Sequence, residues 1–277
     1  MQIPTRRSTS GPNTQITDAT DQFLKQDNRK FFQAALSALG NAPSGEGRVF
    51  IGFIGSRDLP GVTLRRAQSI LRWDLRPSLW SHTFILTSAS MDQSAGSGSP
   101  MVYHVPFDTR SAEFHAPEDN AVIKSSLDIF ADRQRDANVG LISVSLPEAD
   151  VKKVTERCED PNLDRIRYNF WDALGIWQSY FWSFGLRGNP LRDGCPIPAA
   201  SFIEYCFEAL ALDITPGASE RNSAPEHLWN AAKFWYEAYA TKDHVIAGQY
   251  VLRDVGCSVI SSDEKPIVPP RRRRQSA

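Results

Sequence analysis

The chain has 277 residues, of which 41% are hydrophobic and 23% are charged, and its formal net charge is −1 at pH 7. These values are close to those of soluble globular domains and exclude a chain that is disordered along its whole length. A net charge near zero gives the molecule no overall field that would draw it to nucleic acid or to a membrane.

The two ends of the chain differ in composition from the middle. Residues 1–17 are rich in Thr, Ser, Pro and Gly, which predicts a disordered arm, and residues 263–277 predict a flexible basic tail. Between them we expect a single domain over residues 18–262. The chain has neither a secretory h-region nor an apolar run long enough to span a bilayer, so we expect no transmembrane segment. The expected location is the cytoplasm, or export without a cleaved signal peptide.

The first half of the expected domain alternates helical and extended patterns. Apolar residues at helical spacing predict a helix over 18–39 that stops at Gly40, and a basic helical pattern follows at 62–73. Short apolar runs predict strands at 48–55, 81–88 and 101–107. A Gly- and Ser-rich connection joins the last two of these strands, so we expect them to form an antiparallel hairpin.

The second half is predicted to be mainly helical. One further strand is expected at 139–146, and helices are expected at 120–137, 147–160, 199–212 and from 224 onward. The aromatic-rich stretch 167–186 is either core or the wall of a cleft. The order of the elements predicts an α+β fold with a small antiparallel sheet packed against helices.

The candidate catalytic residues are two histidines and the start of one helix. His82 and His104 lie on neighbouring expected strands, where alternation of side chains allows both imidazoles to share a face. A histidine that is oriented by a second polar group suits the role of general base. The helix at 199–212 follows an extended entry, and a thiol at its first residue would be stabilised by the helix dipole. Position 199, however, is alanine.

The four cysteines contain no C-x-x-C pair and are too sparse for a disulfide scaffold, so we expect reduced thiols. Cys206 falls two turns inside the expected helix and is predicted to be a core residue. Cys195 precedes the helix and is the fallback nucleophile.

Five segments, in this order, resemble the circularly permuted papain-like amidases and acyltransferases, a family that includes lecithin retinol acyltransferase. The segments are LWSHTFIL around His82, MVYHVPF around His104, RYNFW at 167–171, AASFIEYCFEALALDITPG from Ala199, and APEHLW at 224–229. In that family the helix begins C-S-E-hydrophobic-V, and here Ala199 stands at the cysteine position.

The resemblance implies a permuted papain-like fold and acyl-transfer chemistry. A cysteine at position 199 would attack an amide, ester or thioester of a peptide, protein or lipid acyl substrate, with His82 as base and His104 as its orienter. The resemblance also assigns Ala200, Tyr168 and Trp171 to the oxyanion and substrate cleft. It implies no metal and no organic cofactor.

Ala199 leaves two explanations open, because a methyl group cannot attack a carbonyl. One is an enzyme whose cysteine was changed to alanine by engineering, and the other is a natural pseudoenzyme that acts as a binding module. A third hypothesis, nucleic-acid binding through Arg271 to Arg274, has only this short basic run in its favour, and no nucleic-acid partner is expected. The enzymatic interpretation requires that His82 face position 199 across a groove.

Overall fold

The computed structural model describes residues 16–40, 46–88, 99–106, 122–160, 199–216, 222–239 and 246–259, together with the separate positions 175, 177, 178, 180, 181 and 218. Seven strands in these ranges form one sheet in the order β1-β7-β6-β2-β3-β4-β5. They are β1 (Ile16–Asp18), β2 (Glu46–Ser56), β3 (His82–Thr87), β4 (Met101–His104), β5 (Ile123–Ser126), β6 (Asp136–Pro147) and β7 (Ile246–Val251). Every neighbouring pair is antiparallel except β1 and β7. The α+β class is therefore confirmed, with a larger sheet than expected.

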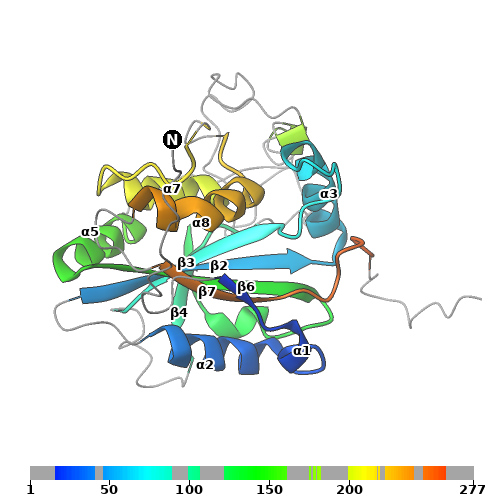
Figure 1. Ribbon diagram of the computed structural model, residues 1–277, viewed down its shortest axis with the longest axis horizontal. Helices are drawn as coiled ribbons and strands as arrows, with labels where there is room; N and C mark the ends of the chain where they lie inside the picture. The colour runs from blue at the N-terminus through cyan, green and yellow to red at the C-terminus, as the bar shows by residue number, and fades with distance from the viewer. Residues whose placement is uncertain are drawn as a thin grey trace, which may run out of the picture.

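Helices cover both faces of this sheet (Figure 1). The helices are α1 (Thr20–Phe23), α2 (Asn28–Leu39), α3 (Leu59–Ala67), α5 (Glu148–Cys158), α7 (Ala199–Glu208) and α8 (Pro225–Tyr239), with the 3-10 helices η1 (Gln68–Leu71) and η2 (Leu127–Phe130). Figure 1 shows α5, α7 and α8 on one side and α1 and α2 on the other. We call these sides the α7 face and the α2 face.

Each face of the sheet buries its own apolar cluster. In β2, Val49, Ile51 and Phe53 belong to the cluster that contains the residues of α7, while Phe50 and Ile54 belong to the cluster that contains the residues of α2. The alternation follows from the period of two along a strand, since successive side chains point to opposite faces. A strand that is buried on both faces has a nearly continuous apolar sequence, and RVFIGFIG in β2 is such a sequence.

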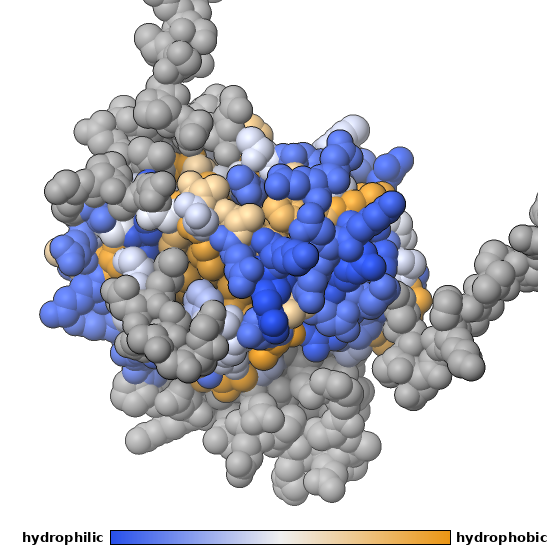
Figure 2. All heavy atoms as spheres, turned by 90° about the horizontal axis from the view of Figure 1, so that it is seen from below, coloured by the Kyte–Doolittle hydropathy of each residue, from blue (hydrophilic) through white to orange (hydrophobic). Residues whose placement is uncertain are grey.

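Local signals explain where the helices of the N-terminal part begin. Asp27 precedes α2 and its carboxylate accepts from the Arg29 backbone N–H, and Asp58 does the same for Gly61 at the start of α3. The outer side of α2 is polar, and Figure 2, which looks from below at the α2 side, shows many hydrophilic residues there with hydrophobic ones between them. The α2 layer is thus an amphipathic cover over one cluster.

Several predicted elements are corrected by the structure. The helix expected over 18–39 is split, because the cap at Asp27 starts a new helix. The helix expected at 120–137 is wrong, since this stretch contains β5 and η2, and β5 pairs with β4 at the edge of the sheet. Residues 16 and 17, assigned to the disordered arm, belong to β1. The remainder of the arm and the tail at 263–277 lie outside the described residues.

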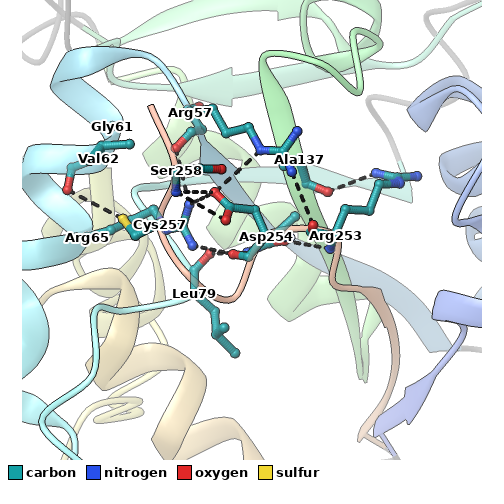
Figure 3. A network of polar contacts seen from close by, with 12 residues as sticks. Arg57, Gly61, Val62, Arg65, Leu79, Ala137, Arg253, Asp254, Cys257 and Ser258 are labelled. Atoms are coloured by element: carbon teal, nitrogen blue, oxygen red, sulfur yellow. Dashed lines mark hydrogen bonds and ion pairs between the residues drawn. The ribbon is translucent and has the colours of Figure 1, made fainter. Parts of the chain in front are cut away.

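The segment that follows β7 is fixed to elements from the start of the chain (Figure 3). The Asp254 carboxylate pairs with Arg65 Nη1 of α3 at 3.0 Å and with Arg57 Nε at 3.4 Å. The Arg253 guanidinium donates to the carbonyl oxygens of Phe23 and Gln26. These contacts and the single sheet join the described elements from β1 to the segment after β7. Within the described ranges, no helix has both the length and the apolar character that crossing a bilayer requires.

Candidate functional site

The structure brings the two candidate histidines together at the start of β3 and the end of β4. His82 Nε2 lies 3.2 Å from His104 Nδ1, and the two rings meet edge to face with centroids 5.3 Å apart. The contact is possible because the strands are antiparallel neighbours, with His104 directly opposite Phe84, two residues after His82. The strand alternation thus places both imidazoles on one face.

A third polar side chain extends this contact across the sheet. His104 Nε2 lies 3.2 Å from the Ser125 hydroxyl oxygen of β5. With both rings neutral, two arrangements fit these distances. Either the Ser125 hydroxyl donates to His104 Nε2 and His104 Nδ1–H donates to His82 Nε2, or His82 Nε2–H donates to His104 Nδ1 and His104 Nε2–H donates to the Ser125 oxygen. Ser125 was not among the predicted site residues, because a helix was expected over 120–137. The alternating pattern IKSS, next to a strand that needs a partner, was the available signal.

The ring of Phe130 contacts both imidazoles. The Phe130 ring centroid lies 5.7 Å from that of His82 and 5.6 Å from that of His104, and Phe130 stacks on Phe84. The Phe84 ring in turn lies over Gly52, where a Cβ atom would come within 1.9 Å of the ring. Glycine at this position therefore makes room for the aromatic stack beside the histidines.

Burial sets the charge of both histidines. It lowers the pKa of His104 to about 4. Burial is also the largest cause that lowers the pKa of His82 well below its usual value, and the nearby His104 and Arg135 add to it. Both imidazoles are therefore neutral at physiological pH.

Position 199 opens α7, as the sequence analysis predicted. Ala199 is 9% exposed and Ala200 is fully buried. Both belong to the cluster of the α7 face, together with Phe53 of β2 and Ile85 of β3. The first turn of α7 is thus packed into the molecule against the sheet.

His82 and Ala199 lie on opposite faces of the sheet. His82 is directly opposite Ile54 in the register of β2 and β3, and directly opposed residues point to the same face. Ile54 belongs to the cluster of the α2 face, as does Phe130, which contacts the His82 ring. The expected approach of His82 to position 199 across a groove is therefore corrected. The physical reason is the period of two, since a shift of one residue along β3 exchanges the faces.

Three other residues assigned to the site fall outside the described part of the chain. These are Tyr168, Trp171 and Cys195, so their relation to α7 stays a prediction. The prediction that Cys206 is a core residue is confirmed, since it is fully buried. Its sulfur lies 3.6 Å from that of Cys158. Burial raises the pKa of Cys206 well above its usual value, so this thiol is a poor nucleophile.

Helix α7 also carries a buried carboxylate that the sequence analysis did not identify. Both carboxylate oxygens of Glu204 lie 2.6 Å from the Thr215 hydroxyl oxygen, and the Ser223 hydroxyl donates to the same carboxylate. Burial raises the pKa of Glu204 to about 7. A carboxylate inside the apolar run SFIEYCF, followed by Thr and Ser in the next loop, was the signal for this cluster.

In the described ranges, no group of three or more His, Cys, Asp or Glu residues is placed to hold a metal ion. Comparison of the chain with protein-family models, with curated proteins and with solved structures finds no match. The likeness to the permuted papain-like family therefore rests on the order of the five sequence segments.

Proposed function

We propose that this chain acts by binding a partner and not as a thiol hydrolase. The observation that carries the proposal is the placement of His82 and Ala199 on opposite faces of the sheet. A cysteine at position 199 would have the N-terminus of α7 to stabilise its thiolate, but not His82 to accept its proton and return it to the leaving group. The permuted papain-like origin of the fold is part of the same proposal and is supported by the motif order alone.

The proposal is tested by restoring the thiol. In the Ala199→Cys variant, we expect alkylation by iodoacetamide at position 199 to be less than about tenfold faster than that of an ordinary thiol, because only the N-terminus of α7 would favour its thiolate. Peptide mass spectrometry separates this site from the four native cysteines, and the unchanged chain gives the background. Adding His82→Ala should leave the rate at position 199 unchanged.

The opposite result would favour the hydrolase. Alkylation at position 199 that is at least tenfold faster than that of an ordinary thiol, and that is lost with His82→Ala, would show that the imidazole reaches the sulfur. Such a result would overturn the proposal and support the hypothesis of an enzyme that lacks only its cysteine.

A second candidate function is supported by the contact between Ser125 and His104. Its order, hydroxyl to imidazole to second imidazole, is the arrangement of nucleophile, base and orienter used in serine acyl transfer. Ser125 would attack the substrate carbonyl as His104 Nε2 takes the hydroxyl proton. We place it second because a histidine with a pKa of about 4 is a weak base at neutral pH.

A fluorophosphonate probe tests the second candidate directly. The binding proposal predicts no adduct on Ser125. A stable adduct on Ser125 that disappears in both the Ser125→Ala and the His104→Ala variants would instead establish a serine nucleophile.

A further inference from the structure

The end of η1 and the turn that follows it expose three large apolar side chains. Trp73 is 96% exposed, Leu75 is 69% exposed and Ile70 is 54% exposed. Single exposed apolar residues are ordinary on a protein surface, but three of them within one short turn mark a contact surface. We call residues Ile70–Arg76 the Trp73 turn.

The Trp73 turn is held in one conformation by its own polar groups. The Arg72 guanidinium forms a two-pronged contact with the Asp74 carboxylate, at 3.0 Å and 2.9 Å. The same carboxylate accepts from the Arg76 backbone N–H, and the Leu75 N–H donates to the Arg72 carbonyl oxygen. Leu75 has a φ of 53°, which a leucine rarely adopts, so its outward position is imposed by the turn. The exposed side chains are therefore preorganised for contact.

The charge around these apolar side chains is positive. From Arg66 to Arg76 the chain contains three arginines and one acid, Asp74, although the whole chain has a net charge of −1. Arg72 is partly buried and pairs both with Asp74 and, at 3.5 Å, with the buried Glu226 of α8, so the charges left exposed are those of Arg66 and Arg76. The Trp73 turn thus combines exposed apolar side chains with exposed arginines.

A second exposed aromatic side chain belongs to the same part of the molecule. Leu64 and Ala67 of α3 share a buried cluster with Tyr180, and Trp177 packs against this cluster. Phe181, which is 51% exposed, stacks on Trp177 with ring centroids 5.8 Å apart. Figure 1 shows the short helical piece that contains these aromatic residues, in lime, beside α3. The aromatic residues that pack beside α3 therefore add Phe181 to the exposed apolar surface of this part of the molecule.

We infer that the Trp73 turn docks on a lipid membrane with an anionic surface. Tryptophan prefers the boundary between headgroups and hydrocarbon, leucine and isoleucine enter the hydrocarbon, and arginines bind the phosphates. The Trp73 turn exposes apolar side chains together with two arginines, and a bilayer interface with anionic lipids provides both hydrocarbon and negative charge. The inference rests on the proposed binding function and names its partner. One exposed turn predicts weak and reversible attachment.

The inference is tested by sedimentation of the full chain with vesicles. We expect binding to vesicles of phosphatidylcholine mixed with phosphatidylserine, and much weaker binding to phosphatidylcholine alone. The double variant Trp73→Ala with Leu75→Ser should bind the mixed vesicles roughly tenfold more weakly or worse. Arg66→Gln and Arg76→Gln should each weaken binding roughly fivefold.

A matched control separates this turn from general surface hydrophobicity. Leu24 is a 44% exposed apolar residue next to α1 on the other side of the sheet, and Leu24→Ala should bind as the unchanged chain does. Thermal unfolding of each variant checks that the fold is retained. A blue shift of tryptophan emission on vesicle addition, lost in Trp73→Phe, would show that Trp73 itself enters the interface.

Two results would overturn the inference. If the double variant binds mixed vesicles as strongly as the unchanged chain, another basic part, such as the arginines at 271–274, accounts for binding. If the unchanged chain does not bind mixed vesicles, the membrane inference is wrong. The thiol-restoration experiment contains no lipid, so failure of the membrane inference and failure of the proposed function are distinguishable.

Discussion

At the scale of single residues, the direction of one side chain decides the chemistry. His82 stands in a sequence context that resembles a catalytic strand, and it meets His104 as the pattern of two neighbouring strands indicates. Its face, however, depends on the register of β3 against β2, which no local motif encodes. The residue type and the pair contact were predictable, whereas the face was not.

The buried carboxylate of Glu204 gives a residue-scale prediction about pH. Its pKa is raised to about 7 from 4.5, so the folded state holds a proton that the unfolded state has lost. The contribution of protonated Glu204 to the free energy of unfolding is fully present below pH 4.5. It declines as the pH rises to about 7. The loss amounts to about 3 kcal/mol at most. In Glu204→Gln, denaturant unfolding at a series of pH values should lack this decline.

The comparison isolates Glu204 because every other titrating group is common to both proteins. Parallel pH profiles for the unchanged chain and Glu204→Gln would contradict the raised pKa. The amide can still accept from Thr215 and can donate to the Ser223 hydroxyl oxygen, so the variant should fold.

The space over Gly52 gives a second prediction at this scale. A Cβ atom there would lie 1.9 Å from the Phe84 ring, so Gly52→Ala should displace the ring and its stack with Phe130. Overpacking of this kind costs about 1–3 kcal/mol, measurable as a lower midpoint of denaturant unfolding. Gly256→Ala is the control, since nothing lies within 4 Å of its Cβ position. Equal effects of the two substitutions would contradict the close approach.

At the scale of elements, the C-terminal segment depends on one buried ion pair. Arg65 of α3 is fully buried, and it pairs with the Asp254 carboxylate and donates to the Asp254 carbonyl oxygen. Asp254→Asn keeps the shape but leaves the guanidinium without its counter-charge, which should cost about 3–5 kcal/mol of unfolding free energy. Asp128→Asn, which removes the partner of the exposed Arg29, should cost less than about 1 kcal/mol.

Calorimetry or denaturant unfolding of the two variants measures this difference. A loss for Asp254→Asn no larger than that for Asp128→Asn would show that the segment after β7 is not held by the pair. In Asp254→Asn, β1 should also detach more readily from the sheet, because β1 pairs with β7 directly before this segment.

The elements themselves were predictable where their periodicity was strong. The strands β2, β3, β4 and β6 and the helices α5, α7 and α8 all lie within or close to the expected ranges. The strands β1, β5 and β7 were missed. β1 and β5 are the edges of the sheet and have only three and four residues, which carry little pattern, whereas β7 lies inside the sheet between β1 and β6. Tertiary context therefore supplied what local propensity could not.

At the scale of the whole molecule, the class of fold followed from the sequence and the candidate site followed only in part. Alternating helices and apolar strands are enough to predict an α+β fold with helices packed on a sheet. The active-site hypothesis needed two distant segments, around His82 and Ala199, to meet on one face. The sheet separates them, because the strand alternation places His82 on the α2 face, whereas Ala199 opens α7, which packs on the other face.

The separation of His82 from Ala199 is measured most directly by nuclear Overhauser effects in NMR spectra of the unchanged chain. A sample labelled at alanine methyl groups and in histidine and phenylalanine rings reports which protons are close. We expect cross-peaks between the His82 ring and the Phe130 ring, and none between the His82 ring and the Ala199 methyl group. A cross-peak between the His82 ring and the Ala199 methyl group would contradict the account and restore the catalytic interpretation.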